Sequence, residues 1–71
     1  MGARPSKIAL REVADLLGVS TSEARRYLRD VQHVAGFPVP YKTIAEAMRE
    51  AGGTTPEVVA RRAAEIEEGR L

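Results

Sequence analysis

The chain of 71 residues has no cysteine and no tryptophan, and its aromatic side chains are one phenylalanine and two tyrosines. Without cysteine it forms neither a disulfide nor a thiolate metal site, which fits a reducing cytoplasm. No apolar run approaches the roughly 18 residues of a membrane span. The basic residues of segment 1–7 are not followed by a hydrophobic stretch, so we expect a flexible arm there and not a signal peptide.

Catalytic constellations are also missing. His33 is the only histidine, and a metal site needs partners that the sequence does not supply, so we interpret it as a loop or helix-end residue. There is no glycine-rich phosphate loop and no nucleophile with a base beside it. We therefore expect no enzyme activity, no metal, no cofactor and no small-molecule ligand.

What remains is a chain for one small domain, which buries only about 60% of its unfolded surface. The net charge is +1, but the charges are unevenly distributed. Residues 1–33 hold six Lys or Arg against four Asp or Glu, whereas residues 34–71 hold five against six. Within 21–29 there are three arginines and one glutamate. This focus indicates either a helix that faces nucleic acid or a solvated arginine-rich face.

Apolar residues recur at helical spacing in four segments, which predicts four helices. We expect one over about 10–17, one over about 21–31, one that begins after Thr43, and one that begins at Pro56 and frays from Glu65. The side chains predicted to face the core are Leu10, Val13, Ala14, Leu17, Ala24, Leu28, Val31, Ile44, Ala47, Met48, Ala51, Val59, Ala63 and Ile66.

The helix ends carry recognisable signals. Gly18 suits the left-handed residue that ends a helix. Ser20 with Glu23, and Thr43 with Glu46, have capping-box spacing, and Thr55 precedes a proline at the first helical position. Segment 32–40 contains a glycine and two prolines, so we expect it to be non-helical, with Phe37 filling the core and a very short β-hairpin as an open alternative.

Segment 18–29 is typical of the turn and second helix of a helix-turn-helix. Arginines beside small hydroxyl side chains suit a helix that enters a DNA major groove, because arginine meets phosphates or guanine edges while short residues let the backbone approach. The alternative for the arginines is intrahelical pairing, with Arg26 reaching Glu23 or Asp30. Arg61 and Arg62 are expected to pair with neighbouring acids.

The order of these signals resembles a known family. Ile8, Glu12-Val13-Ala14, Leu17-Gly18-Val19-Ser20, Arg25-x-Tyr27, Phe37-Pro38, Tyr41 and Gly52-Gly53 occur in the order found in the DNA-binding domain of the MerR superfamily, which includes small phage excisionases and AlpA-like regulators. The sequence departs from the family at Ala9, where a Ser or Thr usually caps the first helix, and it has no Lys or Arg between Arg29 and Lys42.

The resemblance implies a mostly α fold: a compact helix-turn-helix domain of about four helices, with a short or vestigial β wing between the second and third. The domain would cover 8–68, between the arm at 1–7 and a frayed end at 69–71. Tyr27 would either donate its hydroxyl to a phosphate or pack as a half-buried core aromatic, and Tyr41 would close the wing. Lys7 is interpreted as an ordinary solvated residue.

The residues expected to contact DNA are Arg11, Thr21, Ser22, Arg25, Arg26, Tyr27, Arg29 and Lys42. The expected partners are double-stranded DNA, neighbouring copies of the chain and a phage integrase, as for an excisionase or a minimal transcriptional regulator in the cytoplasm, associated with the nucleoid. The alternative is a helical protein-interaction module without DNA binding, for which the exposed candidates are Val34, Val39, Val58 and Leu71.

Overall fold

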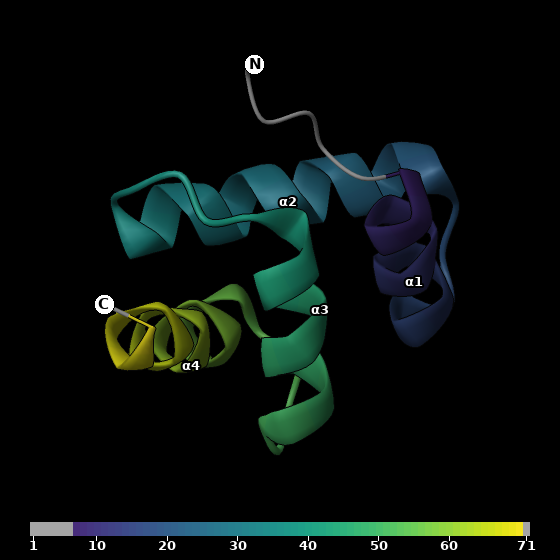
Figure 1. The fold of residues 1–71 in the computed structure, drawn as a ribbon. Helices are drawn as coiled ribbons and strands as arrows, with labels where there is room; N and C mark the ends of the chain where they lie inside the picture. Colours follow the sequence, from purple (N-terminus) through teal and green to yellow (C-terminus); the bar gives the residue numbers. More distant parts are fainter. Residues whose placement is uncertain (1–6, 71) are drawn as a thin grey trace.

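The computed structural model describes residues 7–70 as four helices joined by short links. They are α1 (Lys7–Leu17), α2 (Thr21–Ala35), α3 (Tyr41–Glu50) and α4 (Pro56–Gly69). α2 packs against each of the other three helices, and it runs along one side of the molecule (Figure 1). The mostly α prediction is confirmed, whereas residues 7–70 contain no strand and therefore no β wing.

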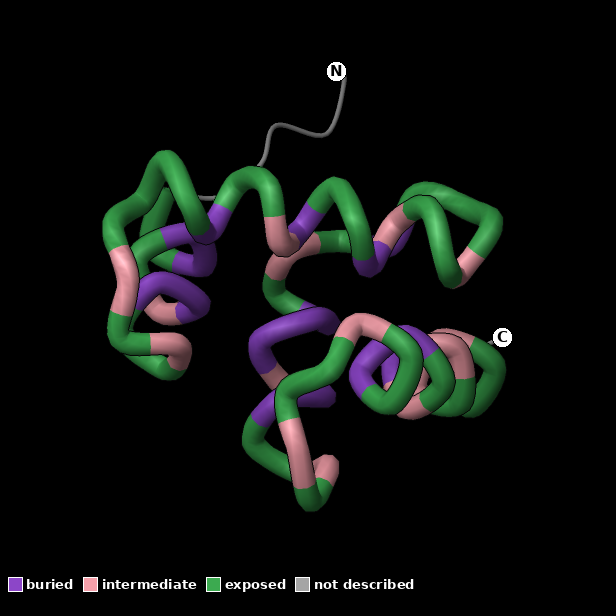
Figure 2. Tube along the Cα trace, turned by 180° about the vertical axis from the view of Figure 1, so that it is seen from behind, coloured by how far each residue is buried: buried purple, intermediate pink, exposed green. Residues whose placement is uncertain are grey.

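A single core lies between the helices, and Figure 2 shows that the buried parts of the chain face inward. From α2, the side chains of Ala24, Leu28 and Val31 are completely buried. Most of the predicted core residues lie in this cluster, while Leu17 and Ile66 pack against it only partly buried. Ala51 was also predicted to face the core, but it lies just after α3 and does not belong to the cluster. Ala9 is also buried, because α1 begins at Lys7 and places this residue inside the helix and not at its cap.

The turn between α1 and α2 follows its sequence signals. Gly18 has φ of 72°, and the backbone N–H of Val19 donates to the carbonyl of Ala14 at 3.0 Å, as in a Schellman motif. Ser20 caps α2 by accepting a hydrogen bond from the N–H of Glu23 at 3.3 Å. These two caps fix where α1 ends and α2 begins, with only residues 18–20 between the helices.

The end of α2 differs from the prediction. The helix continues through Ala35 and ends at Gly36, whose φ is 79°. The side chain of Gln32 then binds both backbone groups of Val39: its amide donates to the carbonyl, and its oxygen accepts from the N–H. With only residues 36–40 left before α3, and with Pro38 and Pro40 lacking N–H groups, no β wing can form.

The residue of segment 36–40 that enters the core also differs from the prediction. Phe37, which was expected to fill the core, is 38% exposed, and Val39 is 2% exposed instead. Val39 was one of the residues expected to be exposed for a partner, and that expectation is wrong. The reason is the Gln32 contact, which satisfies the backbone of Val39 and so lets its side chain enter the core.

α3 does not begin with the predicted Thr43 cap. Its N-terminal flank is Pro40, whose carbonyl accepts from the N–H groups of Thr43 and Ile44. Thr43 therefore lies inside the helix, is 1% exposed, and donates its hydroxyl to Glu67 of α4 at 2.5 Å. Glu46 pairs with Arg70 at 2.8 Å and makes no capping box.

α4 begins as predicted, with the Thr55 hydroxyl accepting from the N–H of Val58 at 3.4 Å and Pro56 in the first turn. The fraying expected from Glu65 is wrong, because the helix continues to Gly69. Contacts of Arg70 with Glu46 and Thr43 attach this end to α3. Leu71 and most of the predicted arm, residues 1–6, lie outside the described residues.

We predict that Gln32→Ala lowers the free energy of unfolding by about 2 kcal/mol, because both backbone groups of the buried Val39 lose their partner. Urea unfolding followed by circular dichroism measures this change. Asp30→Ala, an exposed neighbour on the same helix, is the control and should stay within about 0.5 kcal/mol of wild type. Equal stability of the two variants would contradict the assigned role of Gln32.

Candidate nucleic-acid interface

The face of α2 that points away from the core carries Ser22, Arg25, Arg26 and Arg29, all exposed, and we call it the outer face of α2. It exists because Ala24, Leu28 and Val31 direct the opposite face into the core, and the helical repeat turns the remaining residues outward. Thr21 is exposed at the start of the helix, beside this face.

The arginines of the outer face form no ion pair with any residue from 7 to 70. In particular, Arg26 pairs with neither Glu23 nor Asp30, which was the alternative to nucleic-acid contact. Three guanidinium groups on two successive turns therefore remain available to an external anion.

All ion pairs in the described part of the chain involve other arginines. Arg49 on α3 pairs with Glu12 on α1. On α4, Arg62 pairs with Glu50 and Glu65, and the arginine that follows the helix pairs with Glu46 and Glu67. The pairing expected for Arg62 is thus present, whereas Arg61 is exposed and forms no ion pair within residues 7–70.

These pairs also change the pKa of Arg62 on α4 and of Arg70, which follows α4. Hydrogen bonds to Glu50 and Glu65 raise the pKa of Arg62. The hydrogen bond to Glu46 raises the pKa of Arg70. Because the side chains of both arginines remain open to solvent, the pairs contribute little to stability. Their consequence is electrostatic, since Arg62 and Arg70 offset part of the negative charge of the four glutamates that they contact.

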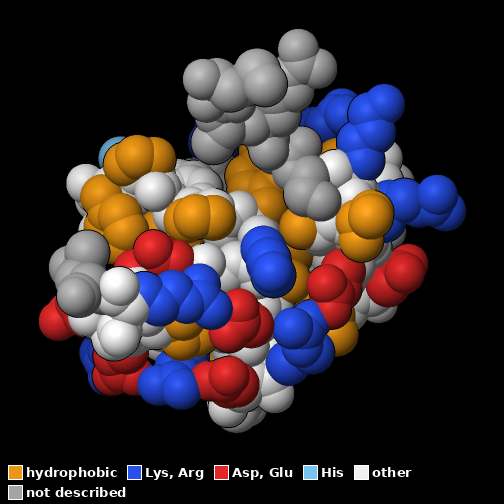
Figure 3. All heavy atoms as spheres, viewed as in Figure 1, with side chains coloured by type: hydrophobic (Ala, Val, Ile, Leu, Met, Phe, Trp, Pro, Cys, Tyr) orange, Lys and Arg blue, Asp and Glu red, His pale blue; other side chains and the backbone are white. Residues whose placement is uncertain are grey.

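The surface view is consistent with this division of charge. In Figure 3, blue Lys and Arg side chains gather at the upper right, where α1 and α2 begin, while red and blue alternate across the lower half. A concentration of one sign of charge attracts an oppositely charged polymer and orients its approach. The lower half, where the signs alternate, lacks such a field.

The beginning of α2 adds a second attraction for phosphate. The N–H groups of Thr21 and Ser22 have no carbonyl within the helix to bind, and the helix dipole makes this end positive. The Ser20 hydroxyl is occupied by its cap, but the hydroxyls of Thr21 and Ser22 are exposed. A phosphate could therefore be held by backbone and hydroxyl donors beside the arginines.

Tyr27 differs from the other candidates, because its hydroxyl is enclosed by the protein and has no hydrogen-bond partner. Burial raises its pKa to about 12 from a usual value of 10.0. The ring packs against the core cluster. In this position the hydroxyl cannot reach a phosphate, so the structure places Tyr27 as a half-buried core aromatic.

The remaining candidates lie on other helices. Arg11 is exposed on α1 and Lys42 is exposed in the first turn of α3, and neither forms an ion pair within residues 7–70. They are accessible cations, but they do not belong to the outer face of α2. His33, interpreted as a loop or helix-end residue, lies in the last turn of α2 and is exposed, so the helix-end assignment is confirmed. The helix itself ends four residues later than predicted.

Other kinds of site find no support in the described residues. Within 7–70, no group of three or more His, Cys, Asp or Glu side chains is placed to hold a metal ion. None of the four helices has the length and apolar character needed to cross a bilayer. Comparisons with protein-family models, with curated proteins and with solved structures found no match.

We predict that Tyr27→Phe raises the free energy of unfolding by about 1 kcal/mol, because it removes a buried hydroxyl that has no partner. The raised pKa of Tyr27 also means that the folded state keeps the proton after the unfolded chain has lost it. Ionisation of Tyr27 therefore leaves the free energy of unfolding unchanged below pH 10.0. The free energy of unfolding then falls as the pH rises from 10.0 towards about 12, where the unfolded chain ionises and the folded protein does not.

Urea unfolding of wild type and Tyr27→Phe near neutral pH and in alkali tests both statements. The alkaline loss of stability should be smaller in the variant. A destabilised variant would show instead that the hydroxyl has a partner in solution.

Proposed function

We propose that this protein binds double-stranded DNA by inserting the outer face of α2 into the major groove. The observation that carries the proposal is that Arg25, Arg26 and Arg29 gather on one helix face without an ion pair within residues 7–70, whereas Arg49, Arg62 and Arg70 are engaged with glutamates. The turn of residues 18–20 presents α2 beside α1 in the manner of a helix-turn-helix.

The geometry suits a groove binder. α2 is one continuous helix of 15 residues, and an α-helix fits the major groove, which is about 12 Å wide. Arg25 and Arg29 lie one turn apart and can reach a guanine edge and a phosphate in the same groove. Thr21 and Ser22 allow close approach at the beginning of the helix.

We also propose that the chain is related to the DNA-binding domain of the MerR superfamily but lacks that family's β wing. One small module buries only about 600–1,000 Å² of protein surface on DNA, so a single copy binds weakly. We therefore propose that several copies act side by side on repeated sites, either as an excisionase that assists an integrase or as a minimal transcriptional regulator. Adjacent copies could also bend DNA, at a deformation cost of roughly 1–6 kcal/mol.

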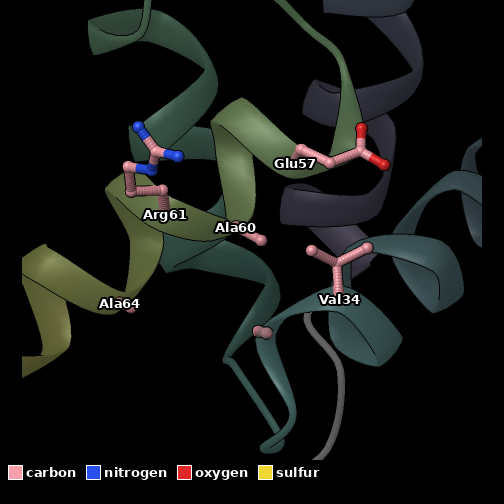
Figure 4. Close-up of a pocket in the computed structure, with 6 residues that line it drawn as sticks. Val34, Glu57, Ala60, Arg61 and Ala64 are labelled. Carbon is pink, nitrogen blue, oxygen red and sulfur yellow. The ribbon is translucent and has the colours of Figure 1, made fainter.

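A second candidate function is supported by a groove between α2 and α4. Figure 4 shows Val34 of α2 pointing toward α4, beside Ala60, with the charged Glu57 and Arg61 at its edges. Val34 is 44% exposed, and Val58 is exposed to the same extent but does not line this groove. An apolar groove of this kind can accept a partner helix, and such binding would depend little on salt.

We predict that the double variant Arg25→Ala/Arg29→Ala binds a short fluorescein-labelled DNA duplex at least about tenfold more weakly than wild type. Its plot of log affinity against log salt, measured by anisotropy between about 50 and 200 mM salt, should be shallower by about two. Both effects arise because two phosphate-neutralising cations are removed while the core is untouched.

Arg61→Ala is the matched control, since it removes an exposed arginine without an ion pair from α4. It should bind DNA as wild type does. If the double variant binds as tightly as the control, with the same salt dependence, DNA binding through α2 is wrong. Binding that is weak and independent of salt in every variant would favour the groove as the functional surface.

A further inference from the structure

α2 is longer than its sequence signals predict, and the extra turn brings His33 into line with the arginines. Arg25, Arg29 and His33 are spaced four residues apart, so their side chains follow one another along one helix face. His33 is exposed and has no hydrogen-bond or ion-pair partner among residues 7–70.

The length of the face limits what His33 can contact. From Ser22 to His33 the helix rises about 16 Å, at roughly 1.5 Å per residue. The major groove is only about 12 Å wide. A helix with its first two turns against base edges therefore extends past the groove at its C-terminal end, where the wall is sugar and phosphate.

We infer that His33 is a phosphate contact at the far edge of the DNA groove, beyond the base edges met by the first turns of α2. This inference rests on the proposed function, and it assigns the C-terminal turn of α2 to contact with the sugar–phosphate backbone of the DNA. An imidazole can donate its N–H to a phosphate oxygen whether or not it is charged. Such a contact fixes the position of the protein on the duplex and carries no sequence information.

The neighbouring residue Val34 offers a matched control. It is in the same turn of the same helix, but it lines the groove between α2 and α4 shown in Figure 4 and is not on the line of Arg25 and Arg29. A charge introduced at position 33 or at position 34 changes the net charge of the protein by the same amount. The two positions are also almost equally far along the helix. Only position 33 continues the line of Arg25 and Arg29 along the helix.

The test compares His33→Lys and His33→Glu with Val34→Lys and Val34→Glu. The probe is a mixed-sequence fluorescein-labelled duplex, and circular dichroism confirms that each variant is helical. We expect His33→Lys to bind more tightly, with a salt slope steeper by about 0.9, and His33→Glu to bind about tenfold more weakly. Because the contact is to backbone, the fold-change should be the same on duplexes of unrelated sequence.

The Val34 variants should change affinity less than twofold, apart from the small effect of net charge. If charges at 33 and 34 have equal effects, the assignment of His33 is overturned even when Arg25→Ala/Arg29→Ala still weakens binding. If that double variant binds as wild type does, the proposed function itself fails and the inference falls with it. A His33 effect confined to one DNA sequence would also overturn the backbone assignment.

Discussion

Everything in this structure depends on the burial of one stripe of α2. Ala24, Leu28 and Val31 are completely enclosed, and α1, α3 and α4 each pack against this helix. Burial of such side chains stabilises a small domain by about 1.5–3 kcal/mol for each large one. The same stripe fixes the rotation of α2 about its axis, so the direction of Arg25 and Arg29 follows from apolar packing on the other side of the helix.

Ion pairing then separates two kinds of arginine. Arg49, Arg62 and Arg70 join neighbouring elements through glutamates, whereas the arginines of α2 form no ion pair within residues 7–70. The net charge of +1 hides this division, because it adds paired and unpaired charges without distinction. A nearly neutral protein can therefore present unpaired arginines on one helix face, and this is the physical basis of the proposed DNA binding.

Local signals predicted the parts of the fold that are locally determined. The Ser20 cap and the glycine at 18 act within a few residues, and both are found where the sequence places them. The end of α2 could not be predicted in this way, since Gln32 is needed to satisfy Val39, seven residues away. The buried contact of Thr43 with α4 joins residues still further apart, so a capping pattern gave the wrong role. The outer face was predicted correctly as exposed, but one turn too short.

The most direct test of the account is a titration of ¹⁵N-labelled protein with a short DNA duplex, followed by the backbone amide signals. The account predicts that the largest shifts fall on the beginning and outer face of α2, from Thr21 to Arg29, while amides of the α2–α4 groove around Ala60 move little. Shifts concentrated on the groove, or no shifts at low salt, would contradict it.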